Sequence, residues 1–324
     1  MLSTIYAAIV RRRRECYARH PELRQRLRHP VISVGNLAVG GRGKTPMVAT
    51  ITRELLAMGE RPAILTRGYA RTERTDGVVV VRDPGGIRAD LARAGDEPLM
   101  LARALPGASV LVCADRYLAG RLAEHQFDAS VHVLDDGFQH LQLDRDVDIV
   151  MIGREDVARP FTLPAGRLRE PLDTIVAADA VIAADDDVMM EGIGIEAPFF
   201  RTRRSLSNSG PALNGARVYA FAGIASPARF FEDLKTLGCT LVATRAFRDH
   251  QRYSRGDLDR LVTEAAAARA QMLVTTEKDL VRLLPYRPFR LPVHAAALTM
   301  EPVPLPEFRQ WLAGSLRAAR DIVG

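Results

Sequence analysis

The arrangement of apolar residues along this chain predicts short buried strands that alternate with helices. Six runs rich in Val, Ile, Leu and Ala lie at residues 30–34, 63–66, 109–113, 131–134, 148–152 and 180–183. After the first run, apolar residues between Met47 and Leu56 recur with the spacing of an amphipathic helix. Strands that are apolar throughout, with helices between them, indicate an α/β fold whose parallel sheet is covered by helices on both faces.

A second series of strands follows residue 190. Runs at residues 218–221, 240–243 and 272–275 predict a second, smaller α/β domain, and residues 198–203 before them are expected to form an edge strand. A chain of 324 residues is long enough for about two domains. We therefore expect an N-terminal helical segment, a first domain, a linker with the second domain, and a C-terminal helix at residues 1–29, 30–190, 191–305 and 306–324.

The first 30 residues carry the net charge of the chain. They contain eight arginines and two glutamates, which accounts for the whole net charge of +6. The remainder is balanced, so nothing indicates nucleic-acid binding. The segment reads as a basic amphipathic helix, with an apolar stripe formed by Leu2, Ile5, Tyr6, Ile9 and Val10.

This stripe is shorter than the roughly 20 apolar residues that cross a bilayer. Arginines near anionic lipid each gain about 1 kcal/mol. We therefore expect peripheral contact with an anionic membrane surface. An ordinary surface helix that packs its stripe on the protein is the alternative.

A glycine-rich loop joins the first predicted strand to the helix that follows. Its residues are Ala38, Val39, Gly40, Gly41, Arg42, Gly43, Lys44 and Thr45. In a phosphate-binding loop, backbone N–H groups cradle the phosphates, the lysine reaches the outer phosphates and the Thr45 hydroxyl holds Mg²⁺. Lys44 is one of only three lysines among 45 basic residues, which makes the match specific. Ala38 stands where the usual pattern has glycine, and a glycine-rich turn without a ligand is the alternative.

Candidate chemical groups follow the predicted strands, where ligands of parallel α/β sheets bind. Asp135 and Asp136 end the fourth strand and are candidates for holding Mg²⁺, against the alternative of a simple Asp-Gly turn. Asp96 is either a helix N-cap or a catalytic carboxylate. His250 is either a catalytic group or a member of a surface pair. Lys278, just beyond a strand, is either functional or a solvated helix start.

The positions of the lysines also indicate which nucleotide the protein binds. Guanine recognition requires an aspartate two residues after a lysine, and none of the three lysines has one, so we expect ATP. Membrane-cycling partition ATPases carry a lysine where Val39 stands, which disfavours a switch of that kind. Three widely spaced cysteines offer neither a disulfide framework nor a metal-binding pair.

Further motifs occur in a fixed order through most of the chain. They lie at residues 34–37, 40–46, 66–69, 95–98, 135–140, 163–166, 168–171, 222–225, 229–231 and 275–279. Together they closely resemble the tetraacyldisaccharide 4′-kinases of lipid A biosynthesis, and they are more specific than any single motif. The family tolerates a small residue other than glycine at the Ala38 position.

This resemblance implies ATP-dependent transfer of a phosphoryl group to a lipid acceptor. The acceptor is the 4′-hydroxyl of a tetraacylated glucosamine disaccharide 1-phosphate at the cytoplasmic face of the inner membrane. The implied fold is a P-loop NTPase-like domain joined to the second α/β domain by a thin β-linker. Carried over by motif, the catalytic residues are Asp96 as base, His250 as its assistant and Lys44, and the metal-site residues are Thr45, Asp135, Asp136 and Glu170.

Two alternatives keep the same nucleotide site. A soluble P-loop kinase of a small metabolite would need no basic amphipathic helix. A membrane-associated ATPase switch would hydrolyse ATP without phosphorylating any acceptor.

Overall fold

The structure is a computed structural model that describes residues 1–69, 71–73, 75–185, 188, 194–208 and 213–321. Its strands are β1 (Val31–Asn36), β2 (Pro62–Thr66), β3 (Val79–Asp83), β4 (Gly86–Ile87), β5 (Ser109–Val112), β6 (Val131–Asp135), β7 (Val147–Ile152), β8 (Ala180–Ala183), β9 (Phe199–Asn208), β10 (Arg217–Ala222), β11 (Thr240–Ala246), β12 (Met272–Thr276) and β13 (Val293–Val303). Its α-helices are α1 (Leu2–Arg19), α2 (Lys44–Ala57), α3 (Leu91–Ala94), α4 (Asp96–Ala104), α5 (Arg116–Phe127), α6 (Arg154–Ala158), α7 (Pro227–Thr236), α8 (Arg255–Ala267), α9 (Glu277–Leu283) and α10 (Leu305–Asp321). Short 3₁₀ helices are η1 (Pro21–Leu23), η2 (Leu172–Ala177) and η3 (Leu284–Tyr286).

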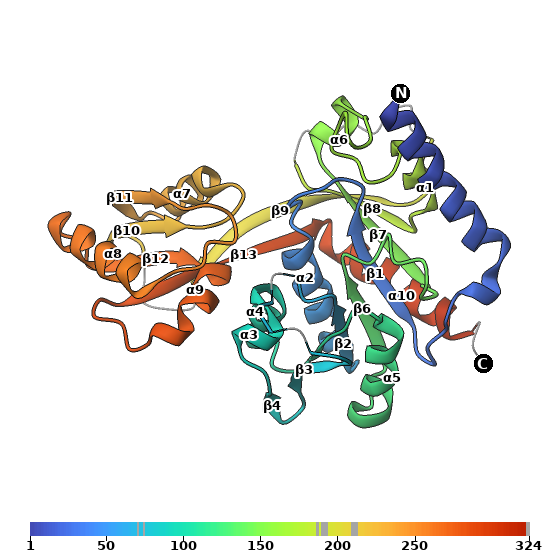
Figure 1. Ribbon diagram of the computed structural model, residues 1–324, viewed down its shortest axis with the longest axis horizontal. Helices are drawn as coiled ribbons and strands as arrows, with labels where there is room; N and C mark the ends of the chain where they lie inside the picture. The colour runs from blue at the N-terminus through green and yellow to red at the C-terminus, as the bar shows by residue number, and fades with distance from the viewer. Residues whose placement is uncertain (70, 74, 186–187, 189–193, 209–212, 322–324) are drawn as a thin grey trace.

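One long sheet runs through the molecule (Figure 1). Within the described ranges its thirteen strands follow the order β11-β10-β12-β13-β9-β8-β7-β1-β6-β2-β5-β3-β4. Most neighbours are parallel, whereas β9 and β13, β3 and β4, and β3 and β5 are antiparallel. The chain is therefore an α/β protein with a mixed, mostly parallel sheet.

The first unit, residues 30–185 together with α10, has helices against both faces of its sheet. At its centre, β1 is parallel to both β6 and β7. Ile32 and Val34 of β1 share one core with α2, α4 and α10, whereas Val31 faces the opposite side and packs in a second core with α5. Because successive strand residues point to opposite faces, a strand that is covered on both sides is apolar throughout.

The second unit consists of β10, β11, β12, α7, α8, α9 and the adjoining part of β13. β10 lies between β11 and β12 and is parallel to both. Phe230 and Leu234 of α7 cover one face, and Leu258 and Leu261 of α8 cover the other. The antiparallel pair β9 and β13 runs between the two units as a two-stranded ribbon (Figure 1).

The expectation of an edge strand at residues 198–203 is wrong. β9 pairs with β8 on one side and with β13 on the other, so it lies inside the sheet. Its partner β13 was not predicted, because most of its side chains are only half-buried and its sequence is neither continuously apolar nor regularly alternating. The expected domain boundary at residues 190–191 lies outside the described residues.

The C-terminal helix α10 returns to the first unit. Phe308, Leu312 and Leu316 are buried in the same core as α2. The ring of Phe308 packs edge-on against Phe200 of β9, with centroids 5.2 Å apart. The start of β9 and the segment after β13, which meet at one end of the ribbon, are therefore anchored in the core of the first unit.

The N-terminal helix α1 lies along the first unit and has no fully buried residue. Tyr6 and Val10 are half-buried on its protein side, whereas Leu2, Ile5 and Ile9 are 69%, 52% and 63% exposed. We call these three exposed residues the apolar face of α1. The predicted stripe is thus divided between the protein and the solvent. Among the described helices, none is both long and apolar enough to span a membrane.

Candidate active site

The glycine-rich loop leads from β1 into α2, which begins at Lys44. Gly43 has a left-handed backbone (φ 79°), and a Cβ there would lie 2.1 Å from Sδ of Met300 in β13. Only glycine meets both conditions. The free N–H groups and the positive dipole end of α2 therefore face the loop, which is an arrangement that binds phosphate.

Lys44 and Thr45 point toward polar groups at the carboxyl ends of β1 and β6. Nζ of Lys44 donates to Oδ1 of Asn36 at 3.0 Å and lies 3.5 Å from Asp136. Oγ1 of Thr45 lies 3.5 Å from Oδ2 of Asp135. The predicted phosphate-loop residues and the predicted acidic pair thus meet at one edge of the sheet.

Other loop residues are held by neighbouring segments. Ala38 is fully buried and forms a β-bridge with Leu168. Arg42 donates to the buried carboxylate of Asp156 in α6 at 2.7 Å, and the carbonyl of Val39 accepts from Arg167 at 3.0 Å. These contacts fix the shape of the loop.

Asp135 and Asp136 have different environments. Asp136 has a left-handed backbone (φ 57°), and its two carboxylate oxygens accept from Arg169 at 2.9 and 2.7 Å. Burial, reinforced by the charges of Glu97 and Asp136, raises the pKa of Asp135 to about 7. A cation next to Asp135 would favour the ionised carboxylate against both burial and the neighbouring negative charges. This carboxylate is therefore suited to a metal.

Glu170 connects the N-terminal helix to the same edge. This residue is 1% exposed, and its carboxylate is engaged by Nε of Arg14 in α1. The hydroxyl of Tyr6, also in α1, donates to the carbonyl of Arg169 at 3.1 Å. In the part of the chain that the structure describes, no three acidic, histidine or cysteine side chains are grouped so as to hold a metal.

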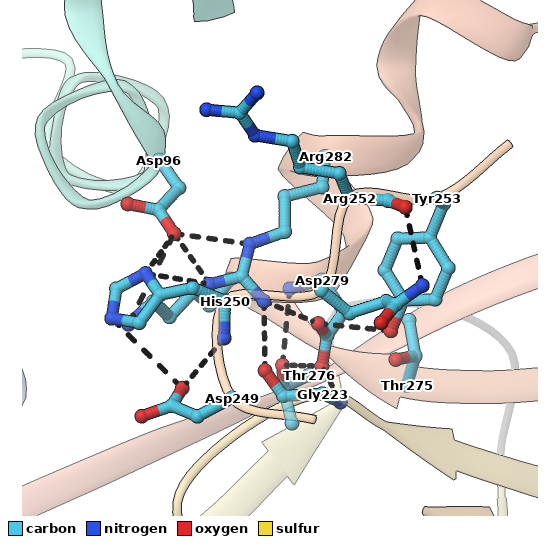
Figure 2. Close-up of polar contacts among 12 residues, drawn as sticks. Asp96, Gly223, Asp249, His250, Arg252, Tyr253, Thr275, Thr276, Asp279 and Arg282 are labelled. Carbon is cyan, nitrogen blue, oxygen red and sulfur yellow. Dashed lines mark hydrogen bonds and ion pairs between the residues drawn. The ribbon is translucent and has the colours of Figure 1, made fainter. Parts of the chain in front are cut away.

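The second half of the site lies where α4 meets the second unit (Figure 2). Asp96 is the first residue of α4, and Gly95 occupies the N-cap position. Oδ1 of Asp96 accepts from the N–H of Glu97 at 2.9 Å, and Oδ2 lies 3.2 Å from Nδ1 of His250. His250 has a left-handed backbone (φ 57°), a conformation that is uncommon outside glycine and often marks functional sites. The structure thus brings the two predicted catalytic residues together across the two units.

Helix α9 brings two further cations to Asp96. Nε of Arg282 donates to Oδ2 of Asp96 at 3.0 Å, and Nζ of Lys278 lies 4.0 Å from the same oxygen. Lys278 also pairs with Glu97 at 2.9 Å and lies 3.4 Å from Nε2 of His250. Positions 278 and 282 are neighbours on one face of a helix, so both side chains meet α4.

Arg282 is itself fixed by a buried network on its far side, which Figure 2 shows. Its Nη1 atom donates to Asp279 and to the carbonyl of Gly223, both at 2.8 Å. Asp279, which is fully buried, accepts in addition from the N–H of Gly223 at 2.9 Å and from the hydroxyl of Tyr253 at 3.0 Å. This network fixes the position of the guanidinium that holds Asp96.

These neighbours set the charge of Asp96. Burial is the largest influence and by itself would raise the pKa of Asp96. The charges of Lys278, Arg282 and His250 together exceed that influence and hold the pKa below its ordinary value. The carboxylate is therefore ionised at neutral pH, as a proton acceptor must be.

Sequence reasoning missed Arg282, Arg169 and Glu97. Arg282 and Arg169 are two of the many arginines in a chain with only three lysines, so their residue type carries little information. Their importance comes from contacts with residues more than 30 positions away along the chain. Lys278 was noticeable because lysine is rare in this chain, but its ion-pair partner could not be identified from the sequence.

Comparisons with known proteins identify the family of the chain. Residues 1–317 match the family model described as tetraacyldisaccharide-1-P 4′-kinase. A tetraacyldisaccharide 4′-kinase of Koribacter versatilis is 41% identical over 307 residues, which cover 93% of each chain. One from Geobacter sulfurreducens is 40% identical over 319 residues, which cover 93% of this chain and 88% of that protein.

A solved structure is also similar over nearly the full length. It is the crystal structure of the "apo" form of LpxK from Aquifex aeolicus in complex with ATP, with 32% identity, a TM-score of 0.81 and 97% of each chain covered. The chain therefore belongs to the tetraacyldisaccharide-1-P 4′-kinase family.

Proposed function

We propose that this chain transfers the γ-phosphoryl group of ATP to the 4′-hydroxyl of tetraacyldisaccharide 1-phosphate, with Asp96 as the general base. The observation that carries this proposal is the contact of 3.2 Å between Asp96 and His250, made across the two units. The similarity to the Aquifex aeolicus structure in complex with ATP supports the choice of nucleotide. The same similarity supports a P-loop type of first unit, joined to the second by the β9–β13 ribbon.

Phosphoryl transfer requires mainly positioning and neutralisation of charge. In this proposal, Lys44 and the N-terminus of α2 bind the outer phosphates and stabilise the charge that develops during transfer. Asp96 accepts the proton of the attacking hydroxyl. Its Oδ1 atom accepts only one backbone N–H within the described residues, so it keeps capacity for the acceptor hydroxyl.

The other side chains around Asp96 position it. His250 and Arg282 both contact Oδ2, and this leaves Oδ1 directed away from them. Because a carboxylate only accepts, Nδ1 of His250 carries the hydrogen in this contact, and Nε2 faces Lys278. His250 therefore orients the base.

We also propose that Thr45 and Asp135 hold Mg²⁺. A hydroxyl and a carboxylate are oxygen ligands that Mg²⁺ prefers, and the ion usually needs only one or two carboxylates because nucleotide phosphates and water supply the rest. When bound, it would neutralise charge on the β- and γ-phosphates. Asp136 lies next to this pair but is engaged by Arg169. Glu170 is left out of this proposal because Arg14 engages its carboxylate.

The lipid acceptor places the protein at a membrane. We propose that the apolar face of α1 inserts among lipid head groups at the cytoplasmic face of the inner membrane, while the neighbouring arginines contact anionic lipid. Phe161 and Val176, which are 61% and 60% exposed, add apolar surface to the first unit. This peripheral attachment would deliver the acceptor to the site without a spanning helix.

A direct assay tests the function. ATP labelled in its γ-phosphate is incubated with purified tetraacyldisaccharide 1-phosphate in detergent micelles. Labelled lipid is expected only with enzyme and acceptor together. Release of labelled inorganic phosphate without labelled lipid would indicate an ATPase switch, and labelling of soluble sugars but not lipid would indicate a soluble metabolite kinase.

A further inference from the structure

Residues 167–170 lie between the N-terminal helix and the glycine-rich loop, and we call them the 167–170 segment. On the loop side, Leu168 forms a β-bridge with Ala38. On the helix side, the hydroxyl of Tyr6 in α1 donates to the carbonyl of Arg169 at 3.1 Å. One short piece of chain therefore contacts both the loop that is expected to bind phosphate and the helix that is expected to contact lipid.

The side chain of Arg169 connects this segment to Lys44. Its guanidinium donates to both carboxylate oxygens of Asp136, at 2.9 and 2.7 Å, and to the carbonyl of Asn36 at 3.1 Å. Nζ of Lys44 in turn donates to Oδ1 of Asn36 at 3.0 Å and lies 3.5 Å from Asp136. Arg169 therefore fixes two of the groups that surround the lysine of the glycine-rich loop.

Arg14 of α1 holds the residues next to this network. Its Nε atom engages the carboxylate of Glu170, which follows Arg169 directly. Its Nη2 atom donates to the carbonyl of Phe138 at 3.2 Å, and its guanidinium lies 4.2 Å from the centre of the Phe138 ring. Phe138 is fully buried and follows Asp136 by two positions. One side chain of α1 therefore restrains both of the stretches that carry Arg169 and Asp136.

The contact between Arg14 and Glu170 is largely shielded from solvent. The two side chains are 18% and 2% exposed. Exposed ion pairs contribute little to stability, whereas removing the partner of a buried charge leaves that charge uncompensated. Arginine also suits the contact with Phe138, because a planar guanidinium donates in two directions and stacks on aromatic rings. Arg14 therefore holds Glu170 and Phe138 together.

Small displacements at a phosphate site have large effects. A misplacement of about 1 Å, caused by a change far from the chemistry, can slow a reaction about 10²-fold. Lys44 stabilises phosphate charge only if its side chain is directed at the phosphates, and Arg169 and Asp136 define its surroundings. Loss of the restraint that α1 places on these two residues would therefore affect the nucleotide.

We propose that Arg14 is a positioning residue for ATP. It holds the two stretches that carry Arg169 and Asp136, and these two side chains set the surroundings of Lys44. This inference rests on the nucleotide site of the proposed function and adds to it a role for α1 beyond lipid contact. The outer face of the helix meets the membrane, and its inner face supports the phosphate loop.

The variant Arg14→Met tests this role, because it removes both polar contacts and keeps an unbranched apolar side chain. The Kd for ATP is measured by calorimetry in detergent, with neither acceptor nor lipid present, so that membrane contact cannot contribute. It is expected to rise by about tenfold or more. Arg12→Met is the matched control, because Arg12 is exposed and lies two positions away, on another side of the helix. It removes the same charge from α1 and should bind ATP as the wild type does.

A double substitution tests whether Arg14 acts through Arg169. Arg169→Met should also weaken ATP binding. If the two residues belong to one network, the double variant should lose less affinity than the product of the two separate losses. A contact that only stabilises the fold would show no such coupling in ATP affinity, and independent effects would therefore contradict the proposed route.

Arg14→Met leaves the carboxylate of Glu170 buried without its cation, so the variant is checked by thermal unfolding. Arg14→Lys is the milder alternative. It keeps a cation for Glu170 but lacks the planar fork that also reaches Phe138, and it should raise the Kd for ATP by about threefold or more. If the methionine variant does not fold, the lysine variant decides.

The outcomes separate this inference from the function on which it rests. A Kd for ATP within about twofold of wild type in the deciding variant would overturn the positioning role and leave the proposed function intact. Equal weakening in Arg12→Met would also overturn it, because the effect would then come from the charge of the helix. A wild-type protein that binds ATP but labels no lipid would remove the proposed transfer and leave the role of Arg14 to be decided by the same measurements.

Discussion

Replacing Asp96 by asparagine removes a buried negative charge at the junction of the two units while keeping the shape of the side chain. If Asp96 accepts the proton of the acceptor hydroxyl, the amide cannot do so, and kcat should fall by about 10²–10⁴. This loss corresponds to roughly 2.7–5.4 kcal/mol of barrier at 1.36 kcal/mol for each factor of ten. ATP affinity should not change, because no contact of Asp96 involves the glycine-rich loop within the described residues.

The substitution should also lower the free energy of unfolding. The side chains of Asp96 and Arg282 are 7% and 6% exposed, and removing one partner of a buried ion pair costs about 3–5 kcal/mol. The lower end applies here, because Arg282 keeps Asp279 and the carbonyl of Gly223. A loss of activity must therefore be separated from a loss of stability.

Asp279→Asn is the matched control for this purpose. Asp279 is the second buried carboxylate on Arg282, so its loss should destabilise the protein by a similar amount while leaving the base in place. Denaturant unfolding gives the stability of both variants, and single-turnover transfer at saturating ATP gives their rates. The reasoning is refuted if Asp96→Asn keeps more than about a tenth of wild-type kcat, or if Asp279→Asn loses as much activity as Asp96→Asn.

Three further predictions use the same transfer assay or a simple binding measurement. Lys44→Ala should lower kcat more than tenfold without unfolding the protein, because it removes charge stabilisation from the transferring phosphate; retention of over a tenth of the rate would contradict this. Replacing the apolar face of α1 by serines should release the protein from anionic vesicles in sedimentation, whereas high salt should release the wild type only in part; unchanged sedimentation of the variant would place the membrane contact elsewhere. Arg282→Gln removes a cation from Asp96 and so raises the pKa of that carboxylate, which must be ionised to act; the acidic limb of the kcat/KM profile should move to higher pH, and an unmoved limb would show that Asp96 is not the titrating group.

Much of the first unit could be predicted from the sequence, because its strands are buried on both faces. Such strands appear as continuous apolar runs, and the six predicted runs correspond to β1, β2, β5, β6, β7 and β8. The sequence around β3 contains four consecutive valines, residues 78–81, and this strand was missed despite that signal. The ribbon strand β13 and the short edge strand β4 left no comparable signal, since they are partly exposed. Local pattern reveals a strand only where burial constrains its composition.

In the candidate site, too, some features had a local sequence signal and others had none. The loop around Lys44 and the acidic pair at Asp135 were recognisable because their spacing within one short segment carries the chemistry. The contact of Asp96 with His250 joins residues 154 positions apart, and Arg282 reaches Asp96 from 186 positions away. For Asp96 and His250, motif resemblance suggested a shared role, but their proximity depends on how the two units meet. No local sequence pattern distinguished Arg282 from the other arginines of the chain.

The return of α10 to the first unit has a consequence for the order of folding. Phe308, Leu312 and Leu316 complete the core that supports α2, so this core stays unfinished until α10 has left the ribosome. Pairing segments this distant in sequence is slow, and it leaves apolar surface uncovered in the meantime. Helix α2 would then acquire its final support only after α10 has been synthesised, and a chain truncated before Leu305 would be expected to aggregate. Trp311, the only tryptophan in the chain, sits on α10 beside Phe308, so its fluorescence would report the moment at which this last piece docks.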